Sequence, residues 1–261
     1  MQIPTKIGER SKAYYVAVTG MMTALVFVLT SIFQISIVAT KGYFNVGEIG
    51  VYISALLFGP YVGAFAGGVG SALADIATGY SIYAPGTLVI KGCEGYLAGF
   101  LLQHFRGKAK KMLPLVLGLI VASCIGVIGV LYYNSVWDLV LGIYINPSGG
   151  ETPLIDLPLL KASISLNSIF WIIVAVISGT AIAYVGTRVN PDISNFVLAV
   201  LVAGSIMVLG YFLYEYLILY AILGMEVFAL FEIPFNIGQA VIGLIVSIPI
   251  VRTLQKAFQQ L

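Results

Sequence analysis

The sequence predicts an all-α membrane protein, a polytopic bundle of transmembrane helices. Of its 261 residues 60% are hydrophobic and only 9% are charged, whereas a soluble globular domain carries about 25% charged residues. Apolar segments of about 20 residues, long enough to cross a bilayer as helix, also recur along the whole chain. The solvent around most of this chain is therefore expected to be lipid, and we predict a multi-pass protein of the cell membrane.

Seven segments have the length and apolar character of a membrane span. They are Ala13–Ser36, Tyr61–Tyr80, Gly86–Phe105, Met112–Tyr133, Ala162–Thr187, Ser194–Leu223 and Ile233–Leu254. An eighth segment, Val46–Phe58, is apolar but short, and it ends at the strong breaker Gly59-Pro60. By itself this segment fits either a short, tilted span or a re-entrant piece.

The basic residues decide between these two possibilities. Cytoplasmic loops of membrane proteins carry an excess of Lys and Arg. Ten of the thirteen basic residues lie in the terminal segments and in two loops, at Lys6, Arg10, Lys12, Arg106, Lys108, Lys110, Lys111, Arg188, Arg252 and Lys256. All ten share one side only if Val46–Phe58 crosses the membrane. We therefore predict one transmembrane domain over residues 1–261, with eight spans and both termini cytoplasmic.

Polar side chains inside the predicted spans gather at one depth. Ionisable residues are costly inside a membrane, so each is a functional hypothesis. At 1.5 Å per residue, the following all lie within roughly 12 Å of the outer surface: Glu48, Asp75, Lys91, Glu94, Glu215, Glu232, Asn236 and Gln239. A through-pore or a proton wire would need polar groups at every depth, so the pattern predicts an outward-facing binding cavity.

Other roles for these residues stay open at this point. Lys91 and Glu94 are three apart and could simply pair with each other. Asn236 and Gln239 could hold two helices together, and Glu48 and Glu232 could be interfacial. Tyr211 and Glu215, four apart, would face one way. Several tyrosines could offer ring faces and hydroxyls to an aromatic ligand; they are Tyr43, Tyr80, Tyr83 and Tyr211.

Small residues recur at helical spacing, which lets helix backbones approach closely in a membrane. On the first span they are Ala13, Ala17, Gly20 and Ala24. Because this is a terminal helix, the stripe predicts either internal packing or a docking surface for another subunit. A second stripe, Gly63, Gly67 and Ser71, favours packing inside the bundle.

Several chemistries have no support in the sequence. No G-x-x-x-x-G-K-[ST] phosphate loop is present. No His pair or Cys cluster suggests a metal site, and no nucleophile–base pair suggests an enzyme. We therefore expect a protein that is not an enzyme and holds neither a metal nor a cofactor.

Six motifs in a fixed order resemble the S component of energy-coupling factor (ECF) vitamin transporters, in the riboflavin-type group. They are Gly42–Glu48 (GYFNVGE), Ala55–Pro60 (ALLFGP), Gly67–Asp75 (GGVGSALAD), Tyr83–Gly95 (YAPGTLVIKGCEG), Gly210–Glu215 (GYFLYE) and Ile233–Gln239 (IPFNIGQ). The matching regions cover about two-thirds of the chain. The resemblance implies a six-helix membrane subunit that binds a vitamin near the outer surface, and that docks on a membrane T subunit and two cytoplasmic ATPases.

The resemblance also implies roles for particular residues. The family's A-x-x-x-A docking motif matches Ala13 and Ala17, and its ligand loop matches Thr40–Gly47 with Asn45 as the polar contact. Ligand contacts on the last helix match Asn236 and Gln239, the second being a lysine in some riboflavin binders. The complete set of expected substrate-binding residues is Asn45, Glu48, Tyr83, Lys91, Glu94, Tyr211, Glu215, Asn236 and Gln239.

The predicted span count exceeds that of the family by two. We assign the excess to an inserted pair, Met112–Tyr133 and Ala162–Thr187, within residues 106–193, whereas residues 1–105 and 194–261 form the six-helix core. The sequence thus predicts a substrate-binding subunit that captures a vitamin or vitamin precursor, riboflavin-like or another small heterocycle. The alternatives are a solitary facilitator or secondary transporter, and a membrane-embedded enzyme or structural subunit.

Overall fold

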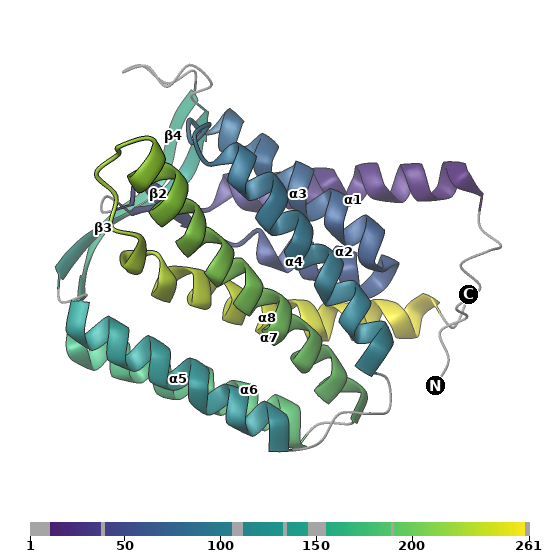
Figure 1. The fold of residues 1–261 in the computed structure, drawn as a ribbon. Coiled ribbons are helices and arrows are strands. Elements are labelled where there is room, and N and C mark those ends of the chain that lie inside the picture. Colours follow the sequence, from purple (N-terminus) through teal and green to yellow (C-terminus); the bar gives the residue numbers. More distant parts are fainter. Residues whose placement is uncertain are drawn as a thin grey trace.

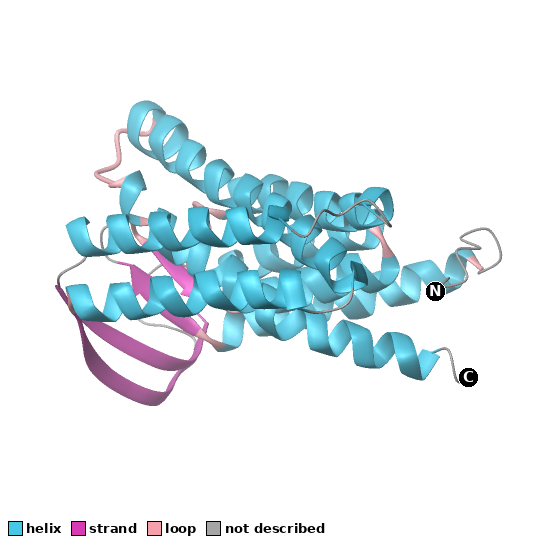
Figure 2. Ribbon diagram, turned by 90° about the horizontal axis from the view of Figure 1, so that it is seen from below, coloured by secondary structure: helices cyan, strands magenta, loops and turns pink. Residues whose placement is uncertain are grey.

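Long helices run side by side along one direction, and two β-hairpins lie together at one end of the bundle (Figures 1 and 2). This arrangement comes from a computed structural model that describes residues 11–37, 40–105, 112–132, 135–145, 155–188 and 191–258. The elements are α1 (Lys12–Ile32), β1 (Gln34–Ile37), β2 (Gly42–Asn45), α2 (Glu48–Phe58), α3 (Pro60–Ala77), α4 (Ala84–Phe105), α5 (Met112–Tyr132), β3 (Ser135–Ile145), β4 (Ile155–Leu166), α6 (Ser168–Arg188), α7 (Pro191–Leu213), the π-helix η1 (Tyr214–Ile222), the short 3₁₀-helix η2 (Ala229–Phe231) and α8 (Ile233–Phe258).

The predominantly helical fold and its apolar surface are those of a membrane protein. Within the described residues, three helical segments are long and apolar enough to cross a bilayer, namely Lys12–Ile32, Ser194–Ile222 and Ala229–Ala257. Helix α1 begins and α8 ends at the end of the bundle away from the hairpins (Figures 1 and 2). The number of spans and the side of the termini stay predictions.

Two predicted spans have wrong boundaries. The first helix ends at Ile32, not Ser36, because Gln34–Ile37 pairs antiparallel with Gly42–Asn45. The expected span Ala162–Thr187 begins as strand β4 and turns helical only at Ser168. In both places an apolar stretch forms a ladder with a second strand, and apolar content alone does not separate a short strand from a helix end.

Helix α2 is a short piece enclosed by the bundle. Its eleven residues cover about 16 Å at 1.5 Å per residue, roughly half of a bilayer core. The break after it comes from Gly59, whose φ of 92° lies in the left-handed region that favours glycine, and Pro60 then begins α3. Because α2 packs against α1, α3, α4 and α8, a polar side chain on it depends on protein partners.

Helices α3 and α4 approach each other through glycines, which confirms the internal packing expected for the Gly63 stripe. A Cβ built at Gly95 would lie 2.2 Å from the carbonyl oxygen of Gly63, and a Cβ at Gly67 would lie 2.8 Å from that of Lys91. Such distances leave no room for a larger residue. The close approach fixes the height of Lys91 relative to α3.

Helices α5 and α6 pack on each other at the side of the bundle formed by α7 and α8, where the buried Trp171 of α6 meets Phe235 of α8. The β3–β4 hairpin that joins them lies against β1 and the end of α1. The helix pair and its hairpin therefore flank the β1–β2 hairpin on one side.

Candidate functional site

A small cavity of about 20 Å³, partly open to solvent, lies beneath the β1–β2 hairpin. The residues that line it are Thr30, Gly42, Tyr43, Asn45, Ser71, Asp75, Tyr83, Thr87, Lys91, Tyr211, Glu232, Asn236 and Gln239. They come from α1, β2, α3, α4, α7, α8 and the turns between them. The lining is almost entirely polar or aromatic, unlike the rest of the buried interior.

The hairpin above the cavity is tied to the helices by three hydroxyl groups. Tyr43 Oη donates to Asp75 Oδ1 at 2.5 Å, Tyr83 Oη donates to the backbone oxygen of Thr40 at 2.6 Å, and the Thr40 hydroxyl donates to the Glu232 carboxylate. Burial raises the pKa of both the Tyr43 and the Tyr83 hydroxyl above the ordinary tyrosine value. Both phenols therefore keep their protons and act as donors.

A chain of amides closes the cavity on the side of α8. The backbone N–H of Asn45 donates to Gln239 Oε1 at 3.1 Å, and Gln239 Nε2 donates to Asn236 Oδ1 at 2.8 Å. Asn45 Oδ1 accepts a hydrogen bond from the backbone N–H of Gly47 at 2.8 Å. Asn236 Nδ2, by contrast, has no acceptor among the described residues. It is a buried donor free to bind a ligand.

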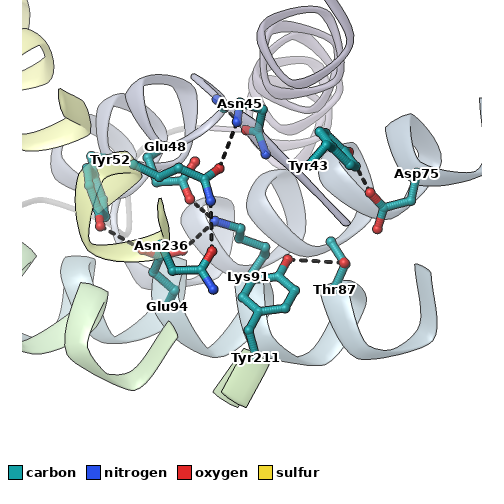
Figure 3. A network of polar contacts seen from close by, with 12 residues as sticks. Tyr43, Asn45, Glu48, Tyr52, Asp75, Thr87, Lys91, Glu94, Tyr211 and Asn236 are labelled. Carbon is teal, nitrogen blue, oxygen red and sulfur yellow. Dashed lines mark hydrogen bonds and ion pairs between the residues drawn. The ribbon is translucent and has the colours of Figure 1, made fainter. Parts of the chain in front are cut away.

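Lys91 is the centre of a buried ion cluster (Figure 3). Its ammonium donates to Glu48 on α2 and lies 3.3 Å from Glu94 Oε2, one turn along α4. Tyr52 Oη donates to the other Glu94 oxygen at 2.6 Å, and the ammonium stands 5.6 Å from the ring centroid of Tyr211. Both glutamates are fully buried and Lys91 is 3% exposed, so the two carboxylates compensate the charge of this lysine.

The family described as "ECF-type riboflavin transporter, S component" matches residues 10–152 and 160–256. The chain belongs to this family. S components are transport subunits rather than enzymes, and they work with a vitamin-type substrate and with ECF T and ATPase modules. The match also includes most of the region that we expected to be inserted.

Two relatives of this S component cover parts of it. An uncharacterized protein of Pyrococcus woesei is 43% identical over 132 residues, which is 46% of this chain and 88% of that protein. The "Thiamine precursor transporter HmpT" of Lactococcus lactis subsp. cremoris (strain MG1363) is 33% identical over 95 residues. That match covers 36% of this chain and 57% of HmpT. One relative is thus named for a substrate other than riboflavin.

Most of the substrate-binding residues predicted for the S component meet at the cavity. Those in its lining are Asn45, Tyr83, Lys91, Tyr211, Asn236 and Gln239. Glu48 and Glu94 bind Lys91 and are not in the lining. Glu215 is also outside the lining and lies 3.4 Å from the Tyr83 hydroxyl. Glu215 belongs to the π-helix η1, whereas Tyr211 belongs to α7, and both side chains are buried.

Several polar residues of the S component cavity were not predicted from the sequence. Thr30, Ser71 and Thr87 line it, but hydroxyls are common at helix contacts and gave no separate signal. Thr87, four residues before Lys91, could have been found from that spacing, and its hydroxyl accepts a hydrogen bond from Tyr211 Oη at 3.1 Å. Asp75 and Glu232 were expected at the depth of the other polar residues but were not assigned to the site, and both line the cavity.

The small-residue stripe of α1 points out of the S component. Its members Ala13, Ala17, Gly20 and Ala24 are all exposed. Buried residues such as Val18 and Val26 hold the other face of α1 to the bundle. A Cβ at Gly20 would meet nothing within 4 Å in the described part of the chain. The stripe therefore leaves a smooth outer face, and its docking role stays a prediction.

Proposed function

We propose that this S component captures a vitamin or vitamin precursor from outside the cell membrane, in the cavity beneath the β1–β2 hairpin. One observation carries the proposal. Polar side chains from five helices and one strand, far apart in sequence, surround a single cavity at the hairpin end. Burying so many polar groups is unfavourable unless something binds them, and a small ligand would supply the missing partners.

We assign the hairpin end of the bundle to the outside and the opposite end to the cytoplasm. Arg252 and Lys256 lie in the last turns of α8, at the end away from the hairpins (Figure 1), as the positive-inside rule requires. This assignment supports eight segments in one transmembrane domain over residues 1–261. In it, residues 106–193 form a side pair whose hairpin flanks the ligand loop.

We assign the exposed stripe of α1 to docking on the T subunit, with ATP hydrolysed by two cytoplasmic ATPase subunits. Small exposed residues at i, i+4 spacing let a partner helix approach closely. A facilitator without ATPases would need polar groups along the inner half of the bundle. The largest buried cluster instead holds apolar side chains such as Val18, Leu244 and Val251, which favours the ATP-driven mode.

Two substitutions separate capture from coupling. In proteoliposomes that hold the full chain with its T and ATPase partners, Ala17→Trp should abolish ATP-driven uptake and leave ligand binding to the isolated subunit unchanged. Asn236→Leu should do the reverse, weakening binding at least tenfold while the complex still assembles. Binding is measured by equilibrium titration of the isolated subunit, and assembly by co-purification of the partners.

Ile177→Trp is the matched control, because Ile177 is exposed as well but lies on α6 and not on α1. It should assemble and transport as the unmodified chain does. If Ala17→Trp lost ligand binding while still assembling, the docking role would be refuted. If Asn236→Leu bound ligand normally, the cavity would not be the capture site.

A further inference from the structure

The cavity presents a buried hydrogen-bond acceptor that the protein does not use. Asp75 is 3% exposed and lines the cavity. Its Oδ1 accepts from Tyr43, but its Oδ2 has no hydrogen-bond partner among the described residues. A buried oxygen without a donor destabilises the folded protein. A ligand N–H directed at Asp75 would remove this cost.

The same lining holds an amide donor that is unpartnered in the described part of the chain, besides the Thr30 hydroxyl. Asn236 is 2% exposed, and its Nδ2 has no acceptor in the described chain because Gln239 occupies only its Oδ1. Asp75 and Asn236 lie on either side of Tyr211 in Figure 3, and all three line the same cavity. A ligand therefore needs a donor at one edge and an acceptor at the other.

The charges of the lining disfavour an anion. Among the described residues that line the cavity, Lys91 is the single cation, and its ammonium is already engaged by Glu48 and Glu94. The lining adds the carboxyl groups of Asp75 and Glu232. A phosphate or carboxylate on the ligand would meet carboxylates without a free cation, which excludes anions by repulsion and desolvation.

The rings of the lining favour a flat ligand. Tyr43, Tyr83 and Tyr211 all border the cavity, and the Tyr43 ring packs on Tyr80 with centroids 4.3 Å apart. Phenol rings offer planar faces on which an aromatic heterocycle packs well. The ligand should therefore be flat and carry both an N–H donor and a ring acceptor.

We propose that the ligand is a small planar nitrogen heterocycle that carries an amino group and no phosphate or carboxylate. Its amino group donates to Asp75, a ring nitrogen or carbonyl accepts from Asn236, and its faces contact the tyrosines. This assignment rests on the proposed function, because it takes the cavity to be the capture site. It distinguishes the ligand from flavins, whose ring edge carries two carbonyl groups and a ring N–H but no amino group.

The test compares two probes that differ in one group, 4-aminopyrimidine and 4-methoxypyrimidine, by calorimetric titration of the purified full chain. The first carries an amino donor where the second carries a methoxy group, which can only accept. The unmodified chain should bind the amino compound at least tenfold more tightly, and Asp75→Asn should lose that preference. Because the preference is measured on the unmodified chain, the test does not depend on the variant folding.

Two further arms separate failure of this inference from failure of the proposed function. Riboflavin is titrated as a third probe, and small molecules extracted from the purified protein are identified by mass spectrometry. Equal binding of the two pyrimidines, or tight binding of riboflavin that Asn236→Leu abolishes, would overturn the amino-heterocycle and keep the capture site. Absence of binding by all three probes and of any extracted heterocycle would overturn both.

Discussion

The two ends of the helix bundle differ in what their helices bury. At the hairpin end, α4 buries Lys91 and Glu94, and α8 buries Asn236 and Gln239. Towards the other end the same α8 buries Leu244, Ile248 and Val251 in an apolar cluster with α1, α2 and α7. Helix α8 therefore contributes polar residues to the cavity at one end and apolar residues to the core at the other. The polar half is the part that a ligand completes, and the apolar half holds the bundle together.

The contrast also separates binding from stability. Burial of apolar side chains stabilises by roughly 25 cal/mol per Å², so the apolar end supplies folding free energy directly. A buried ion cluster offsets its own desolvation at best, but it becomes strongly destabilising when one partner is lost. Substitutions of charged residues at the hairpin end are therefore expected to lower the free energy of unfolding most. Variants at this end and elsewhere in the bundle test this difference.

The largest effect is expected for Lys91→Met. This change leaves Glu48 and Glu94 buried without a cation, and breaking a buried pair in this way costs about 3–5 kcal/mol. The midpoint of thermal unfolding in detergent should fall accordingly, and ligand binding should be lost. Lys12→Met, at an exposed position of α1, should change stability by no more than about 0.5 kcal/mol.

A triple variant tests whether the uncompensated carboxylates cause this loss of stability. Replacing Glu48 and Glu94 by Gln in the Lys91→Met background removes the uncompensated charges and should restore part of the lost stability. Equal unfolding midpoints for Lys91→Met and Lys12→Met would mean that the ion cluster is not buried as described.

A smaller effect is expected at the contact between α3 and α4. Gly95→Ala places a Cβ 2.2 Å from the Gly63 carbonyl oxygen, and overpacking of this kind costs typically 1–3 kcal/mol. Gly92→Ala on the same helix meets its nearest atom at 3.6 Å and should be neutral or slightly stabilising. Unfolding midpoints of the two variants compare them directly. A destabilised Gly92→Ala beside a normal Gly95→Ala would contradict the helix register.

The smallest effect is expected for Tyr43→Phe, which removes the donor to Asp75 and should cost about 1 kcal/mol at pH 7. Burial raises the pKa of Tyr43, so the unfolded chain ionises first as pH rises. The free energy of unfolding of the unmodified protein therefore falls above about pH 10. The Phe variant has no hydroxyl at this position and does not show this fall. The stability gap between the two should narrow above that pH; a widening gap would contradict burial of the hydroxyl.

The depth of polar residues in the sequence was enough to locate the cavity. Lys91, Asn236 and Gln239 lie on different helices, yet counting residues from each helix end placed them at one level, because helical rise is constant. The short segment before Gly59 was also predicted, because a Gly-Pro pair marks a turn, and α2 ends at Phe58.

What the sequence did not predict depends on tertiary contacts. Gln34–Ile37 is apolar enough to continue α1, and it becomes a strand only because Gly42–Asn45 pairs with it. Thr30 and Ser71 enter the lining through the packing of α1 and α3. Glu215 lies outside the lining, where its carboxylate accepts from the Tyr83 hydroxyl. None of these outcomes is encoded in a local pattern.

Native mass spectrometry of the purified chain tests the central claim most directly, because it detects any small molecule held beneath the hairpin. The unmodified protein should carry one bound small molecule per chain, and Asn236→Leu, prepared in the same way, should carry none. Equal occupancy in both proteins would contradict the account, since a ligand that does not depend on Asn236 is not held in the polar cavity.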